Sequence, residues 1–451
     1  MKTIRTGLLS LAIFTGLLPL KAQQVDTASY SYSLQQCIDF AIQHNTNVEN
    51  AVLDETAASE KVKEIAGSGL PQINASAQVQ HFVVIPTTVI PGGGPFGGMP
   101  GTFTKIQLGT SDNASLSFTA SQLVFSGSYF VGLKATKTYE ELAKKNVTRT
   151  QLETASEVTK AYYTVLVNDE KKKLLDANLL RVKKLVDDTK ALLDNGFVEK
   201  IDFDRITVTY NNLKTEVDNI NRLLDLSLVL LKYQMGMDQS AHLTTTDKIE
   251  NLTFSTDAAS SGKFDYNKRI EYQLYDLNLT GQRLLLKSER MGYLPTVALF
   301  GTMSTNCYRS SFDFFKSTTP WYPIGIIGLQ MNIPIFDGFQ RHYRVQQAEV
   351  GILKAQNNLV FMQQTIDMQQ AVARVNLQNS ASSMQSQKDN LALAQGVFDV
   401  AQKKFDQGVG SNLEVINAQT ALKEAQTNYF NALYDALIAK VEYDKSIGIF
   451  K

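Results

Sequence analysis

Few residues in this chain have the types and spacing needed for catalysis or metal binding. The four histidines are scattered, with no metal-ligand spacing: His44, His81, His242 and His342. Cys37 and Cys307 lie in non-equivalent parts of the chain, so the sequence suggests no disulfide framework. We find no Gly-x-Ser-x-Gly motif, phosphate loop or dinucleotide-binding fingerprint. We therefore expect neither an enzyme nor a protein that carries a metal or cofactor.

The most suggestive polar residues are two acids that follow glycine turns. Asp202 comes six residues after Gly196, and Glu414 comes six residues after Gly408. A glycine in such a place most simply ends a helix. An acid at the start of the next helix gains about 0.3–1 kcal/mol from the helix dipole. The chemistry predicted for these residues is thus electrostatic.

This glycine–acid pattern belongs to a repeat that covers most of the chain. The pair Leu70-Pro71 recurs as Leu294-Pro295, and Gly196 recurs in the same way as Gly408. Solenoid repeats have periods of about 20–50 residues. The period here is several times longer, which indicates two copies of one architectural unit.

We assign residues 23–236 to the first copy, residues 237–264 to a linker rich in Ser, Thr and Asp, and residues 265–451 to the second copy. The first copy is the longer one between its Leu-Pro pair and the start of its long helix. We place this excess in residues 86–103, whose glycines and prolines indicate an exposed turn that would tolerate shortening.

The N-terminus predicts export. Lys2 and Arg5 precede an apolar stretch, residues 7–20, and Ala22 offers a small residue for cleavage, so residues 1–22 resemble a secretory signal peptide. No later run of about 18 apolar residues indicates a transmembrane helix. The chain has 44 basic and 44 acidic residues, and this balance implies no nucleic acid partner.

Four segments alternate like strands with one apolar and one polar face. In the clearest of them, Ile327, Leu329 and Met331 alternate with glycine, glutamine and asparagine, and the apolar series runs on through Ile333 and Ile335. The other three are residues 72–85, 115–119 and 296–303. The segment 308–323 between the last two strands is aromatic and holds the only tryptophan, Trp321, which suits a membrane interface.

The remaining sequence predicts long helices. A first helix is expected at residues 34–67, and very long ones at 128–194 and 339–407, neither of which contains a proline. Apolar residues repeat at heptad spacing in both, which predicts coiled-coil packing. A helix that spans residues 128–194 is roughly 100 Å long. A shorter helix returns after each turn glycine.

Four strands cannot close a barrel in lipid, because open sheet edges leave backbone groups unpaired in hydrocarbon. The smallest outer membrane barrels have about 8 strands. The strands must therefore be pooled among subunits, most simply by cyclic symmetry. Two chains would supply 8 strands and three would supply 12.

This order of elements, written twice, resembles the TolC-like outer membrane efflux proteins. The resemblance rests on the two Leu-Pro pairs, on residues 333–338 at the join of strand and helix, and on the turn at residues 408–419. It implies an α+β membrane protein and a homotrimer with four strands per chain. Its 12-stranded β-barrel would lie in outer membrane lipid and continue into a long periplasmic α-helical coiled-coil barrel. A periplasmic adaptor protein and an inner-membrane transporter would be its partners in efflux or type I secretion.

The resemblance also implies roles at the helical tip. Glu414 matches an acidic residue that projects into the pore near its constriction, and Asp202 matches an acidic residue that helps to lock the pore. A second acidic pore position falls at Asn417, which is neutral here. The start of a helix explains both acids equally well without any pore role. The turn glycines would also contact the adaptor: Gly196, Gly408 and Gly410.

The family's lock cannot be complete in this chain. Its aromatic hydroxyl and its arginine fall at Phe405 and Gly410, which can supply neither group. Another pairing is needed, such as Lys200 or Arg205 with a carboxylate. A trimeric coiled-coil outer membrane scaffold or adhesin is the alternative function, and it would pass no ion current.

Overall fold

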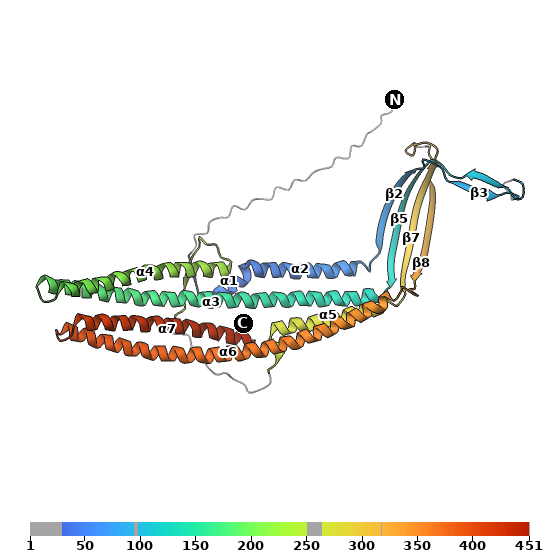
Figure 1. The fold of residues 1–451 in the computed structure, drawn as a ribbon. Helices are drawn as coiled ribbons and strands as arrows, with labels where there is room; N and C mark the ends of the chain where they lie inside the picture. Colours follow the sequence, from blue (N-terminus) through green and yellow to red (C-terminus); the bar gives the residue numbers. More distant parts are fainter. Residues whose placement is uncertain (1–28, 94–97, 250–263, 317, 451) are drawn as a thin grey trace, which may run out of the picture.

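The computed structural model describes residues 29–93, 98–249, 264–316 and 318–450. The expected signal peptide lies outside the described residues, as do residues 250–263 of the expected linker. A four-stranded sheet stands at one end of the molecule, and a long layer of helices leaves its base (Figure 1).

The main sheet is antiparallel, with the strand order β2-β5-β7-β8. Its strands are β2 (Gln72–His81), β5 (Asp112–Phe125), β7 (Thr296–Arg309) and β8 (Tyr322–Asn332). The four expected strands are therefore confirmed. Each Leu-Pro pair immediately precedes a strand, where the missing N–H of proline costs no ladder hydrogen bond.

One face of this sheet is apolar and exposed. Leu329 of β8 lies opposite Leu299 of β7, and Met303 of β7 lies opposite Phe118 of β5. Gln330, on the other face, lies opposite Ala298. The expected alternation in β8 is confirmed, although the strand ends before Ile333 and Ile335.

The excess of the first copy forms a β-hairpin, so the expectation of a simple turn is wrong. β3 (Thr87–Pro91) pairs with β4 (Phe103–Gln107) in a separate two-stranded sheet. Figure 1 shows this hairpin projecting from the far end of the main sheet. β-branched residues such as Thr87, Thr88 and Val89 favour strands here, and Gly92, Gly93 and Gly98 lie between the two strands.

A second small sheet was not expected. β1 (Ser29–Tyr32) pairs in parallel with β6 (His242–Thr245), which lies inside the predicted linker. Asp247, just after β6, accepts hydrogen bonds from the Leu34 backbone N–H (2.8 Å) and the Tyr162 hydroxyl (3.0 Å). This part of the linker is therefore packed against the first repeat.

The first expected helix is two helices, α1 (Leu34–His44) and α2 (Thr46–Gly67). The break lies at Asn45, whose extended backbone caps α2 through a bond from the Asn47 N–H to its side chain (2.8 Å). The Asn45 amide also donates to the Gln234 carbonyl (2.8 Å). A contact so distant in sequence left no local signal.

The second repeat has the same plan with a shorter start. A single 3-10 turn, η2 (Tyr266–Lys268), precedes α5 (Ile270–Met291). Both α2 and α5 have 22 residues, and each is followed by a Leu-Pro pair and a strand of the main sheet. The boundaries that we assigned to the copies stay a prediction.

The long helices are α3 (Gly127–Asp194) and α6 (Gln340–Asp406), and the return helices are α4 (Lys200–Met235) and α7 (Asn412–Ser446). Both heptad seams are confirmed, because Leu175 and Val182 of α3 share one buried cluster with Phe398 and Ala401 of α6. Val415 and Leu422 of α7 belong to the same cluster and are fully buried.

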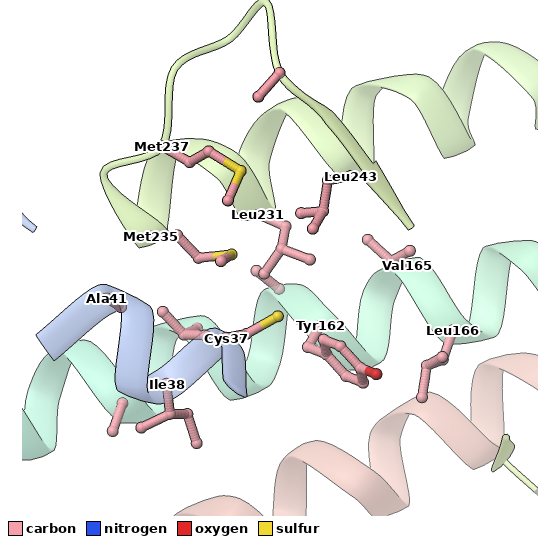
Figure 2. Close-up of a cluster of buried hydrophobic side chains, with 14 residues drawn as sticks. Cys37, Ile38, Ala41, Tyr162, Val165, Leu166, Leu231, Met235, Met237 and Leu243 are labelled. Carbon is pink, nitrogen blue, oxygen red and sulfur yellow. The ribbon is translucent and has the colours of Figure 1, made fainter. Parts of the chain in front are cut away.

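A second cluster lies midway along the layer, where α1 packs on α3 and α4 (Figure 2). Cys37 of α1 lies in it among Tyr162 of α3 and Leu231 and Met235 of α4. Burial raises the pKa of the Cys37 thiol to about 12, so this residue acts as a small apolar side chain. Cys307 is also buried and free, on β7 in a different cluster.

Candidate pore constriction

Both turns at the helical tip are built in the same way. Gly196 and Gly408 each have φ +73°, the left-handed conformation that glycine adopts without strain. The Phe197 N–H bonds to the Leu192 carbonyl (2.9 Å), and the Val409 N–H bonds to the Lys404 carbonyl (3.0 Å). These are Schellman caps, so the expectation that the glycines end the long helices is confirmed.

Gly410 has a different reason to be glycine. A Cβ at this position would lie 2.9 Å from the Lys404 Cβ and 3.0 Å from the Phe405 backbone nitrogen. The turn therefore folds tightly against the end of α6, and Phe405 packs partly buried against the apolar cluster below.

Asp202 lies in the first turn of α4, where its carboxylate is 3.7 Å from the Arg205 guanidinium. The sequence analysis named Lys200 and Arg205 as possible partners of a carboxylate at the lock. Arg205 lies near such a carboxylate, that of Asp202 on its own helix. The backbone carbonyl of Asp202 accepts a hydrogen bond from the Asn412 amide at 2.9 Å. Asn412 begins α7, so this bond ties the tips of the two repeats together.

Glu414 lies in the first turn of α7. Its backbone N–H bonds to the side chain of Ser411, the N-cap residue, at 3.2 Å. Its carboxylate forms an ion pair with Lys404 of α6 at 3.1 Å, and both side chains are about half exposed. The helix-start geometry is thus present, and a cation stands beside the acid.

Glu414 and Asn417 line one groove between α6 and α7. The opposite wall consists of small and apolar α6 residues, among them Gly396, Val397 and Val400. The two predicted pore positions therefore share a surface. Asp202 is not among the residues lining this groove, and it is joined to α7 by the Asn412 bond instead.

Sequence reasoning missed Lys404 and Asn412. Lys404 precedes the turn by about as many residues as Glu414 follows it, so folding the sequence about Val409 would have paired them. Asn412 gave no such signal, because its partner is a backbone carbonyl of the other repeat. Within the described residues, no group of three or more His, Cys, Asp or Glu could hold a metal ion. The tip places charged side chains beside the turns, with Lys404 next to Glu414 and Arg205 near Asp202.

Residues 283–448 match the family model described as outer membrane efflux protein, and this range includes the second tip turn. Over 443 residues the chain is 21% identical to outer membrane protein TolC of Salmonella enteritidis, an alignment that covers 96% of this chain and 85% of that protein. The chain is a TolC-like outer membrane efflux protein.

Solved structures agree with this TolC-like fold. The outer membrane protein VceC of Vibrio cholerae superposes with a TM-score of 0.67 at 14% identity, covering 92% of this chain and 96% of that one. The open-state MtrE outer membrane channel of Neisseria gonorrhoeae gives 0.67 at 16% identity, covering 92% and 88%. The expected α+β tunnel fold is confirmed.

The TolC-like protein is located in the outer membrane, with its helices in the periplasm, and it functions as an efflux channel. None of the helices in the described part of the chain is both long and apolar enough to cross a membrane. The scaffold or adhesin alternative accounts for neither the family match nor the shared fold.

Proposed function

We propose that three copies of this TolC-like protein form one channel-tunnel, through which an inner-membrane pump and a periplasmic adaptor export a substrate. The observation that carries the proposal is the four-stranded sheet with an exposed apolar face. In the described part of the chain, β2 and β8 each pair on one side only. Lipid tolerates no such open edge, so these edges must pair with other copies.

The polar face of the sheet supports three copies over two. Its residues are mainly serine, threonine, asparagine and glutamine, such as Asn74, Ser117 and Thr302. An 8-stranded barrel is nearly filled by its own side chains. A 12-stranded barrel would leave room for water along this polar face.

The helical tip supports docking of a periplasmic partner. Phe197 and Val409, which directly follow the turn glycines, are 77% and 76% exposed. Two large apolar side chains at corresponding places of both repeats would give a three-chain tunnel six apolar contacts at its end. We assign the adaptor contact to these residues together with Gly196, Gly408 and Gly410.

We place the constriction at Glu414, Asn417 and Asp202. Three-fold symmetry would turn each position into a ring, and rings of acidic side chains favour cations. Lys404 beside each Glu414 offsets this charge, so the expected cation preference is modest.

The constriction is tested by reversal potentials of single channels in planar bilayers. Glu414→Gln should lower the cation preference, and Lys404→Gln should raise it. Glu60→Gln is the matched control, because Glu60 also pairs with an exposed lysine but lies on α2, far from the tip (Figure 1). If both tip variants leave selectivity and conductance unchanged, Glu414 only starts a helix.

The channel itself is tested more simply. The purified protein should pass current in a bilayer, and its mass in detergent should be that of three chains. A stable monomer would contradict the trimer, and a trimer that passes no current would favour the scaffold alternative.

A further inference from the structure

The two repeats contact each other inside one chain, and this contact is a template for the contact between chains. Midway along the layer, Lys160 of α3 forms an ion pair with Glu442 of α7 at 2.6 Å. Nearer the tip, the Asn178 amide of α3 donates to Gln426 of α7 at 2.7 Å. We call this contact the intrachain seam. It runs antiparallel, and it has polar pairs at these two points, with Val167 of α3 and Phe430 of α7 in one buried apolar cluster between them.

The repeat relation predicts which residues would meet if the next copy continued the same packing. Gly196 corresponds to Gly408, and the long and return helices are aligned by counting from these two glycines. The counterpart of Lys160 is then Val372 on α6, and the counterpart of Glu442 is Leu230 on α4. The ion pair of the intrachain seam would thus be replaced by two apolar side chains from different copies.

Further apolar residues lie one turn to either side of Val372 and Leu230. Met368, Val372 and Val375 form a stripe on α6, and Leu226, Leu230 and Tyr233 form a stripe on α4. In antiparallel register, Met368 falls within one residue of Tyr233, and Val375 falls within one residue of Leu226. All six side chains are between 43% and 68% exposed in the single chain.

The two stripes cannot cover each other within one molecule. Figure 1 shows α4 and α6 at opposite edges of the helical layer, with α3 and α7 between them. Water-exposed apolar stripes at matching heights, on the two edges that a ring would bring together, favour a second copy as the occupant.

We propose that these six residues form an apolar interchain seam, in which α6 of one copy packs on α4 of the next. The proposal rests on the proposed trimer and deepens it, because it names the joint and its chemistry. At the height of Lys160 and Glu442, the tunnel wall would then alternate between an ion pair inside each chain and an apolar contact between chains. A periplasmic partner on either stripe is the competing occupant.

The full-length protein with Val372→Cys and Leu230→Cys tests the seam by oxidative crosslinking in membranes. Disulfides form only when the Cα atoms are within about 7 Å. We expect covalent dimers and trimers from the double variant and none from either single variant. Val360→Cys with Val208→Cys is the matched control: same residue type, same two helices, 52% and 58% exposed, but out of register.

A charge exchange tests the same seam without cysteines. Val372→Lys alone should lower the fraction of trimer that survives heating in detergent, and adding Leu230→Glu should restore most of it by recreating the intrachain ion pair. Crosslinking equal to that of the control pair, or no restoration, overturns the seam. If the native mass is still that of a trimer, only the seam has failed. If the mass is that of a monomer, the proposed trimer has failed as well.

Discussion

Arginine substitutions along β8 should reveal which face of the sheet meets lipid. Ile327 lies at the middle of β8 (Tyr322–Asn332), with Leu329 two residues and Met331 four residues toward the helices. At about 3.3 Å per residue and a strand tilt of about 40°, these steps correspond to depths of about 5 Å and 10 Å.

The expected cost follows from these depths. Arginine costs about 2–4 kcal/mol at the midplane of a barrel's lipid face and about 0–1 kcal/mol near the interface. With an apolar band about 25 Å tall, Leu329→Arg should cost about 2 kcal/mol per chain and Met331→Arg about 1 kcal/mol. Three copies multiply the loss, so the Leu329 variant should lose roughly 6 kcal/mol per trimer.

The assay is unfolding by urea of the protein in lipid vesicles, and the loss of the trimer band on a gel measures it. Gln330→Arg is the control, since Gln330 lies on the opposite face of the same strand. We expect the order Ile327, Leu329, Met331, Gln330 from most to least damaging. Equal effects at Leu329 and Gln330, or a larger effect at Met331 than at Ile327, would refute the assignment of the lipid face.

Three further predictions concern the sheet end and the helices. Hydrogen bonding and charge from Arg309 lower the pKa of Asp313 from 3.8 to about 2. Ionised Asp313 should hold the loop between β7 and β8 in order above pH 4, and this order should be lost as the pH falls toward 2. The fluorescence emission of Trp321, the only tryptophan, should report the change. If Asp313→Asn leaves this emission unchanged, the prediction is contradicted. Gly236→Ala should destabilise the helices by well over 1 kcal/mol, because φ is +70° and the new Cβ would lie 2.4 Å from the His44 carbonyl oxygen. Gly196→Ala is the control and should cost only about 1 kcal/mol, because φ is +73° but the new Cβ would meet open space. Equal melting temperatures of the two variants would count against the steric argument. Removing residues 89–101, within the β3–β4 hairpin, should leave the trimer intact on native gels, and its loss would mean that the hairpin holds copies together.

The features that could be predicted from the sequence are those with a local period or a local conformational demand. The alternation of Leu329 with Gln330 marks a strand, the spacing of Leu175 and Val182 marks a coiled coil, and Gly408 marks a helix end. These signals need no knowledge of distant contacts.

The features that could not be predicted depend on distant partners. The helix break at Asn45 is held by Gln234, and the pairing of β1 with β6 joins the start of the first repeat to the linker that follows it. At the tip, Asn412 reaches a carbonyl of the other repeat. Glu414 was found from the sequence, but Lys404, whose positive charge offsets the negative charge of Glu414, was not.

The matched lengths of the helices set a rule for redesign. α3 and α6 have 68 and 67 residues, and α4 and α7 have 36 and 35, so both hairpins end at one level although their residues differ. A deletion in one helix would move its turn out of level with the other turns at the tip. It would also rotate every side chain after the deletion about the helix axis. A tunnel of a different reach would need seven residues removed from all four helices together, which shortens it by about 10 Å and leaves each face in place.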